Sequence, residues 1–479
     1  MADGGYLLGG YSTSGTNDNK TSPNYGNGDF WVVRLGANGN RLWDKTYGGT
    51  GDDQLSCLRP TSDGGFILGG SSDSPASGNK SAPNFGSKDF WVVKTDANGN
   101  KIWDAAFGGT ALDIVFSVQQ TRDGGYIVGG YSTSGTNVNK TAPNYGTAGS
   151  DGDFWVVRLD GNGTKLWDKS FGGSDDDGIY TVQELAGGGF ILAGNSASPG
   201  SGTKTSPSYG GYDFWLVRLD AAGNQVWDRS FGGSADDGFD FARVLQTSDG
   251  GFIVGGDSLS PVSGNKTNAN HGSSDFWVVR LDSNGNKLWD RAYGGTGFDE
   301  LSDLAQTADG GFLLAGLSSS LPGDNKTSQN YGSTDFWVVR VDSQGNPLWD
   351  ASFGGNSDDG FYKVSLLAAS DGGWLLGGDS RSGISGNKTT VNYGNRDFWV
   401  VKLAAAPPTL RVVPQQNVAQ AGFQFFLDGQ PNQFYVVEYC THFGAWIPLS
   451  TNQMIGTEIS ITDLGATNSN ARFYRARKK

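Results

Sequence analysis

Asp153-Phe-Trp-Val-Val-Arg-Leu159 is the stretch that decides the fold, because its first three residues recur seven times. The copies begin 60 to 64 residues apart, at Asp29, Asp89, Asp153, Asp213, Asp275, Asp335 and Asp397. Self-similarity at a fixed period of this length is typical of repeat architectures. A residue that is present in every copy is most economically explained by packing, which every copy needs. The sequence therefore predicts architecture more directly than function.

The repeat around this stretch predicts four short strands. Residues 114–121, 126–130, 153–159 and 165–171 are apolar or β-branched runs, separated by Gly-rich turns or by a long polar loop. One four-stranded antiparallel sheet with apolar residues on both faces must be covered on both sides, and radial stacking of such sheets does this. We therefore expect an all-β fold, a seven-bladed β-propeller of four-stranded blades, in preference to an open β-solenoid.

The terminal repeats are incomplete. The Trp-Asp strand occurs six times, at Trp43, Trp103, Trp167, Trp227, Trp289 and Trp349, and the first strand also occurs six times. We expect the first blade to lack its first strand and the last blade to lack its fourth. Thr409-Leu-Arg-Val-Val is a candidate for that fourth strand; otherwise, residues upstream of Met1 or strands that the pattern does not reveal would be needed to close the ring.

Three motifs carry a resemblance to a known family. These are Phe-Gly-Gly-Ser-x-x-Asp, then Asp-Gly-Gly-Tyr-Ile-Val-Gly-Gly, then Asp-Phe-Trp-Val-Val-Arg-Leu-Asp-x-Asn-Gly-Asn-x-x-Trp-Asp. Over residues 3–404 the chain resembles the propeller-type repeats of secreted and surface-anchored bacterial and archaeal proteins. The resemblance implies an extracellular or cell-surface propeller and supplies no catalytic residues.

Composition divides the chain into two domains. We expect a propeller over residues 1–404, a linker over 405–409, where Ala and Pro dominate, and a small β-sandwich over 410–479. The second domain resembles fibronectin-type-III-like modules in Tyr-Val-Val-Glu, Trp446 and Arg-Phe-Tyr-Arg.

Charge and apolar content limit the partners. The 479 residues carry a formal net charge of −14, which argues against nucleic acid and anionic membranes as partners. No apolar run approaches the length of a membrane span, and no signal peptide is visible at the start. The two cysteines, Cys57 and Cys440, fall in different predicted domains, which makes a disulfide framework impossible.

Catalytic patterns are missing from the sequence. Only two histidines occur: His271 takes the place of a loop aromatic, and His442 lies in the small domain. No Ser-His-Asp, Cys-His or zinc constellation can be built from them. The carboxylates recur repeat by repeat, whereas a catalytic pair should break the symmetry. We therefore expect a protein that is not an enzyme.

The long loop of each repeat is the main candidate for a binding surface. It follows the pattern Gly-x-Asn-Lys-Thr-x-Pro-Asn-Tyr-Gly with modest variation. One interpretation is a Lys–Asp pair that pins each loop to the Asp-Phe-Trp strand. The other is a multivalent ring that grips glycans or an acidic polymer. The candidate ligand-binding residues are Asn19, Lys20, Tyr25, Asn79, Lys80, Asn139, Lys140, Tyr145, Lys204, Tyr209, Asn265, Lys266, Asn325, Lys326, Tyr331, Asn387, Lys388 and Tyr393.

A second set of carboxylates follows the Gly-Gly link into the next repeat. Calcium takes six to eight oxygen ligands, which loop carboxylates, amides and carbonyls could supply. The candidate metal ligands are Asp53, Asp113, Asp177, Asp237, Asp299 and Asp359. The Asp-x-Asn-Gly-Asn turns, such as residues 282–286, superficially resemble part of a calcium loop, but their position between two strands predicts type I′ hairpin turns.

These features together predict a non-enzymatic binding or adhesion module outside the cell or on its surface. Its recognition surface would be the loop face, with carbohydrate or a protein as partner. The alternative is a structural surface protein that self-associates through the incomplete blades, because unpaired strand edges invite pairing.

Overall fold

The computed structural model describes residues 3–361, 363–404, 409–412, 422–429, 433–441, 446–454, 458–468 and 472–479. The described residues form strands and one short 3-10 helix, η1 (Leu464–Asn468). No helix among them is long and apolar enough to span a bilayer. The predicted linker 405–409 lies almost wholly outside the described residues, as does His442.

Seven antiparallel sheets follow the seven sequence repeats. The first sheet holds β1 (Tyr6–Ser12), β2 (Asp29–Leu35) and β3 (Arg41–Tyr47). The second holds β4 (Asp53–Pro60), β5 (Phe66–Ser72), β6 (Asp89–Thr95) and β7 (Lys101–Phe107), and the third β8 (Asp113–Gln120), β9 (Tyr126–Ser132), β10 (Asp153–Leu159) and β11 (Lys165–Phe171). The fourth holds β12 (Asp177–Glu184), β13 (Phe190–Ser196), β14 (Asp213–Leu219) and β15 (Gln225–Phe231).

The last three repeats continue this order. The fifth sheet holds β16 (Asp237–Gln246), β17 (Phe252–Ser258), β18 (Asp275–Leu281) and β19 (Lys287–Tyr293). The sixth holds β20 (Asp299–Gln306), β21 (Phe312–Ser318), β22 (Asp335–Val341) and β23 (Pro347–Phe353). The seventh holds β24 (Ser365–Ala368), β25 (Trp374–Ser380) and β26 (Asp397–Leu403).

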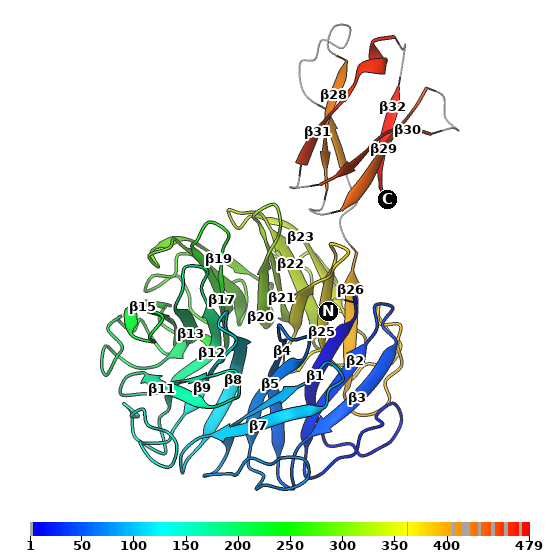
Figure 1. Cartoon of the computed structure of the whole chain (residues 1–479). Coiled ribbons are helices and arrows are strands. Elements are labelled where there is room, and N and C mark those ends of the chain that lie inside the picture. The colour runs from blue at the N-terminus through cyan, green and yellow to red at the C-terminus, as the bar shows by residue number, and fades with distance from the viewer. Residues whose placement is uncertain are drawn as a thin grey trace.

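The sheets stand side by side around a common centre (Figure 1). The strands nearest that centre, here called the inner strands, are β4, β8, β12, β16, β20 and β24. From β4 to β20, each inner strand contacts the inner strand of the next sheet, as β8 contacts β12. The strands farthest from the centre, the outer strands, carry the Trp-Asp motif in six of the sheets. The seven sheets of this all-β protein are therefore arranged like the blades of a propeller.

One aromatic contact joins each sheet to the next. The Phe of one Asp-Phe-Trp motif packs on the Trp of the following motif, and both rings are fully or largely buried. The centroid distances are 4.6 Å for Phe30–Trp91, 4.5 Å for Phe90–Trp155, 4.6 Å for Phe154–Trp215, 5.0 Å for Phe214–Trp277, 4.7 Å for Phe276–Trp337 and 4.9 Å for Phe336–Trp399. A seventh contact joins the two ends of the array, because Phe398 stacks on Trp31 at 4.9 Å.

The turns between third and fourth strands differ from the predicted type I′ form. In residues 282–286 only Gly285 has a positive φ, of 79°. Gly285 N donates to Asp282 O at 3.1 Å, and the strand register shifts at Arg280/Leu281. This geometry is a three-residue loop built on a type I turn with a glycine bulge, which needs one left-handed residue instead of two.

The first and seventh sheets each lack one strand, as the sequence predicts. Among the described residues, no inner strand lies beside β1 in the first sheet and no outer strand lies beside β26 in the seventh. The candidate for that outer strand is wrong: β27 (Thr409–Val412) pairs with β28 (Phe423–Asp428) in the C-terminal part of the chain.

The C-terminal part contains two three-stranded sheets. One has the order β27-β28-β31, and the other has the order β30-β29-β32. The remaining strands are β29 (Phe434–Cys440), β30 (Ile447–Gln453), β31 (Glu458–Asp463) and β32 (Phe473–Lys478). The two sheets share a core of Phe425, Leu427, Tyr435, Val437, Met454 and Ile461. Cys440 in β29 and Cys57 in β4 are both free thiols.

Candidate functional site

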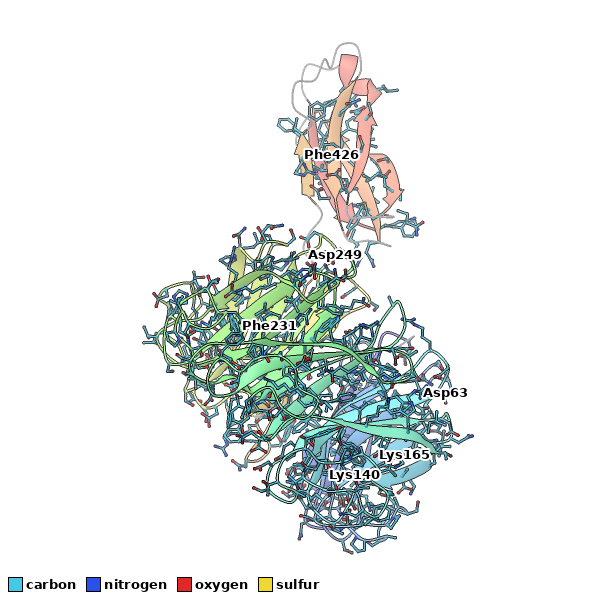
Figure 2. All side chains as sticks on the ribbon, turned by 90° about the vertical axis from the view of Figure 1, so that its left-hand side faces the viewer. Asp63, Lys140, Lys165, Phe231, Asp249 and Phe426 are labelled. Atoms are coloured by element: carbon cyan, nitrogen blue, oxygen red, sulfur yellow. The ribbon has the colours of Figure 1, made fainter. Side chains whose placement is uncertain are left out.

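The seven loop lysines are buried inside their own loops. Lys140, labelled in Figure 2, is 1% exposed and donates to Ala142 O at 2.8 Å, Pro143 O at 3.2 Å and Ser170 Oγ at 3.0 Å. Its ammonium group also lies 5.6 Å from the ring centroid of Trp155, a cation–π geometry. Desolvation lowers the pKa of Lys140 to about 8, although nearby aspartates oppose the shift.

The prediction that each loop lysine pairs with the Asp of an Asp-Phe-Trp motif is therefore wrong. Among the described residues no ion pair joins a loop lysine to the Asp of an Asp-Phe-Trp motif; the lysines donate to loop carbonyls and side-chain oxygens. Burial of the other six lysines is similar, between 1% and 4% exposed, at Lys20, Lys80, Lys204, Lys266, Lys326 and Lys388. A ligand on the surface of the loops does not meet these ammonium groups.

The asparagine and threonine of the same motif are also used internally. Asn79 Oδ1 accepts from Gly48 N at 2.9 Å, and its Nδ2 donates to Thr46 O at 2.8 Å, both in the preceding repeat. Asn139, Asn265, Asn325 and Asn387 make the equivalent pair of bonds. The following Thr, as in Thr141, donates to the Asp of the Trp-Asp strand. The Asn-Lys-Thr motif thus joins a loop to two sheets.

Among the candidate binding residues, four loop tyrosines and two asparagines, Asn19 and Asn387, are exposed. Tyr25, Tyr145 and Tyr331 are 37–39% exposed, and Tyr393 is 53% exposed, whereas Tyr209 is half-buried. Each of the first three, and Tyr209, packs its Cβ against the loop glycine of the next repeat, as Tyr145 does on Gly202. Of the candidate binding residues, these tyrosines, Asn19 and Asn387 are those that a ligand can reach.

The six candidate metal ligands are fully buried and lie beside the Asp of Asp-Phe-Trp. Asp153 Oδ1 and Asp177 Oδ2 lie 1.9 and 2.8 Å from the point that a Cβ on Gly172 would occupy, so only glycine fits between them. Asp177 Oδ2 accepts from Gly173 N at 2.7 Å and from Ser198 Oγ at 2.9 Å. Asp53, Asp113, Asp237, Asp299 and Asp359 accept from the equivalent glycine.

Burial raises the pKa of both carboxyls of such a pair. Burial, and then the charge of Asp177, raise the pKa of Asp153 to about 7, while the bond from Tyr145 N opposes the shift. Burial also raises the pKa of Asp177 to about 6 against the hydrogen bonds that it accepts. Among the described residues no three His, Cys, Asp or Glu side chains gather into a metal site. Calcium remains a prediction without a described set of ligands.

The inner strands carry a layer of side chains that breaks the repeat symmetry. The second strand of each sheet carries Gly-Gly or Ala-Gly, and one inner-strand residue pairs with the first residue of that dipeptide. In successive sheets this inner-strand residue is Cys57, Ser117, Thr181, Arg243, Asp303 and Ser365. Arg243 Nε donates to Asp303 Oδ1 at 2.8 Å, and Asp303 Oδ2 accepts from Leu366 N at 3.0 Å. One ion pair therefore spans two inner strands at the centre of the molecule.

Two further cations face this pair. Desolvation and repulsion by Arg243 lower the pKa of Lys363 to about 8, and the same two causes lower the pKa of Arg59. Surrounding protein atoms partly desolvate Arg59, but its side chain remains accessible to solvent, and among the described residues its guanidinium donates only to Leu58 O, at 3.1 Å. Burial raises the pKa of the Asp303 carboxyl, but Arg243 and Lys363 outweigh burial and lower it. Three cations thus surround one carboxylate, and we name Arg59, Arg243, Asp303 and Lys363 the central cationic cluster.

Aromatic side chains border this cluster. Phe116 lies 5.1 Å from Tyr180, and Tyr180 lies 5.8 Å from Phe241, measured between ring centroids on three successive inner strands. Lys363 Nζ lies 5.9 Å from the ring centroid of Phe241. Burial raises the pKa of the Cys57 thiol to about 11, although Arg59 and Lys363 oppose the shift. A thiol with this pKa stays protonated at neutral pH and is a poor nucleophile.

The recurring motifs do not predict the central cationic cluster. Arg243 and Asp303 occupy one register position in strands 60 residues apart, and Arg59 and Lys363 lie two residues from that position in their own repeats. These residues differ from repeat to repeat, so they belong to no recurring motif. The signal was available: an arginine and an aspartate stand at a position where neighbouring repeats have serine or threonine.

Comparisons with known proteins leave the family open. No family model matches the chain. The regulatory protein FlaEY of Caulobacter vibrioides is 24% identical over 403 residues, which cover 78% of this chain and 41% of FlaEY. The chain thus spans less than half the length of that curated relative.

Solved structures resemble the chain only distantly. A protein of unknown function from Dyadobacter fermentans is 12% identical, with a TM-score of 0.41, and the match covers 74% of this chain and 95% of that chain. A puromycin hydrolase is 11% identical, with a TM-score of 0.40, and the match covers 84% of this chain and 57% of the hydrolase. Likeness at this level carries no argument about function.

Proposed function

We propose that the seven sheets close into a seven-bladed β-propeller, which is a binding module without catalytic activity and takes an anion at its centre. The observation that carries the anion site is the central cationic cluster: three cations and one carboxylate in a protein whose net charge is −14. The stack of Phe398 on Trp31 supports closure, because the same Phe–Trp contact joins each of the six other pairs of neighbouring sheets.

The chemistry of the cluster favours a carboxylate or phosphate group as ligand. Arginine presents a planar fork of donors that suits both groups. Arg243 Nε donates to Asp303, whereas the guanidinium of Arg59 donates to a backbone carbonyl. Repulsion among Arg59, Arg243 and Lys363 is relieved when an anion binds, and this relief adds to the hydrogen bonds that the anion accepts.

Calorimetric titration with inorganic phosphate tests the anion site. We expect binding that weakens as salt increases, because the contacts are ionic. Arg59→Gln should abolish the binding while the unbound protein keeps or gains stability, since one of three repelling cations is removed. Lys45→Gln is the control, because Lys45 lies in the outer strand β3 and contacts Asn100. Equal phosphate affinity in the wild type and in Arg59→Gln would exclude this site.

Binding rather than catalysis also agrees with the other observations. The matching Caulobacter protein is described as a regulatory protein, a role that binding serves without catalysis. The proposed place of action is outside the cell or on its surface, on the basis of the resemblance in the repeat motifs. Fractionation of the native host, with the chain followed by antibody, tests that location.

A second candidate function is carbohydrate binding by the loop tyrosines. Its support is the exposure of Tyr25, Tyr145, Tyr331 and Tyr393, since aromatic rings offer flat apolar faces that sugars can stack on. A glycan array in calcium and in chelator tests it. Tyr331→Ala should weaken any glycan binding that depends on these rings. Lack of any glycan signal in both conditions would leave the central anion site as the proposed function.

A further inference from the structure

The unpaired edges of the first and seventh sheets belong to one gap in the repeat pattern. Six times in the chain an outer strand, a Gly-Gly link and the next inner strand follow one another, as in residues 165–184, which hold β11 and β12. The first sheet lacks its inner strand and the seventh lacks its outer strand. Since Trp31 stacks on Phe398, β2 and β26 belong to neighbouring sheets. One strand–link–strand segment therefore corresponds to both missing strands.

The edge of the seventh sheet has donors that lack the acceptor found in the other sheets. In the third sheet Asp168 accepts from Thr141 N at 2.8 Å, from Ala142 N at 2.9 Å and from Trp155 Nε1 at 3.1 Å. The outer strand supplies that aspartate. In the seventh sheet the equivalent donors have no hydrogen-bond acceptor among the described residues; they are Thr389, Thr390 and Trp399.

The edge of the first sheet shows the complementary side chains. Asn79 binds the backbone of the preceding outer strand and its Gly-Gly link, but the equivalent Asn19 is exposed and its side chain has no partner among the described residues. Ser74 Oγ donates to Asp53 Oδ2 at 2.8 Å, and Ser74 is fully buried. The equivalent Ser14 is exposed, and its hydroxyl has no partner in the part of the chain that the structure describes.

Burial follows the same division. Every residue of β5 and β6, which lie between two neighbouring strands of their sheet, is buried. In β1, the equivalent of β5, every residue is half-buried or exposed, and β26, the equivalent of β6, has one buried residue in seven. Unpaired strand edges accept a further strand through main-chain hydrogen bonds, and pockets for alternate side chains give selectivity.

We propose that these two edges form one binding site for a strand pair of the pattern Trp-Asp-x-x-Phe/Tyr-Gly-Gly-x-x-x-Asp, supplied by a separate polypeptide. The Trp-Asp strand pairs with β26, where its Asp accepts from Thr389, Thr390 and Trp399. The Gly-Gly link meets Asn19, and the last Asp of the pattern accepts from Ser14. The second strand pairs with β1.

A second copy of this protein is a poorer donor than a separate segment. All six segments of this pattern in the chain are already paired in their own sheets. Donation of one of them would leave the donor with the same two unpaired edges, so that exchange gains no net pairing. The inference rests on the proposed ring of sheets, whose own test is the Phe398 substitution described below, and it is independent of the anion site.

Titration of the full chain with a synthetic peptide of residues 165–184 tests the site. We expect saturable binding by calorimetry with one peptide per chain and a rise in the melting temperature. A peptide with Asp168→Ala should bind at least tenfold more weakly, because three donors lose their acceptor, and a shuffled peptide should not bind. Lack of binding of the native peptide at millimolar concentration, or equal binding of the shuffled peptide, would overturn the proposal.

Variants of the protein provide the matched controls. Asn19→Ala should weaken peptide binding several-fold and leave the melting temperature without peptide unchanged, since its side chain has no partner. Asn79→Ala, at the equivalent paired position, should lower the melting temperature without peptide. Light scattering of the chain alone distinguishes the source of the segment. A dimer that dissociates when the peptide is added would show that a second copy of this protein supplies the strand pair, which would overturn the proposal of a separate segment.

Discussion

At the residue scale, the loop lysines act as internal hydrogen-bond donors. Lys140→Met keeps most of the buried volume but leaves two carbonyls and a hydroxyl without their donor. Unsatisfied buried polar groups cost about 1–3 kcal/mol each, with partial relief by rearrangement, so we expect a loss of about 2–4 kcal/mol in the free energy of unfolding. Urea denaturation measures this loss, with Lys45→Met as the control, because Lys45 is half-buried and donates to Asn100 Oδ1 at 3.5 Å. A loss below about 0.5 kcal/mol would contradict the role.

The buried aspartate pairs predict the pH dependence of stability. The pKa of Asp29 is raised to about 6, and those of Asp89 and Asp153 to about 7, with burial as the main cause. A carboxyl with a folded pKa above its unfolded value binds its proton more tightly in the folded state. The contribution of each such carboxyl to stability is therefore fully present below the unfolded pKa and is lost as pH rises through the folded value.

We expect a higher melting temperature at pH 5 than at pH 7.5, as measured by calorimetry. Asp168, whose hydrogen bonds lower its pKa to about 2 despite burial, contributes stability that is lost below about pH 4, outside this window. The free energy of unfolding should also be higher at pH 5 than at pH 7.5. Asp153→Asn should reduce this difference in free energy by about 1–2 kcal/mol, because one titrating group is removed. An unchanged difference would show that Asp153 titrates normally.

At the element scale, the outer strand is what each loop binds. Thr141→Val removes the hydroxyl that donates to Asp168, whereas Thr389→Val changes the equivalent loop of the seventh sheet, which has no outer strand. Loss of one bond to a charged group costs about 1.5–3 kcal/mol. We expect that loss for Thr141→Val and no measurable loss for Thr389→Val in urea denaturation. Similar losses for both would mean that the seventh sheet has an acceptor after all.

At the scale of the whole molecule, one aromatic stack joins the ends of the repeat array. Phe398→Ala removes the ring that lies on Trp31, and large-to-small substitutions of aromatic residues in cores cost about 3–5 kcal/mol. Because Phe398 is half-buried, we expect a smaller loss, about 1–3 kcal/mol, together with faster amide exchange in β1, β2, β25 and β26. Phe154→Ala, at a fully buried copy of the contact, is the comparison. No loss for Phe398→Ala would argue against a closed ring.

The sequence by itself determined the repeat, the strands and the incomplete terminal sheets. These follow from local patterns: the spacing of Asp-Phe-Trp, apolar runs of strand length and glycines at the turns. It misassigned Thr409–Val412 and the type I′ turns, because apolar runs do not reveal their pairing partner and Asn-Gly suits more than one turn.

Only the tertiary structure decided what the recurring polar residues do and where the symmetry breaks. Lys140 looks like a surface cation in the sequence, but the loop folds over its side chain and turns three acceptors toward it. Arg243 and Asp303 meet because β16 and β20 are neighbours at the centre, although they stand 60 residues apart in the chain. Contacts between repeats depend on how the sheets stack, and the pattern inside one repeat does not contain that information.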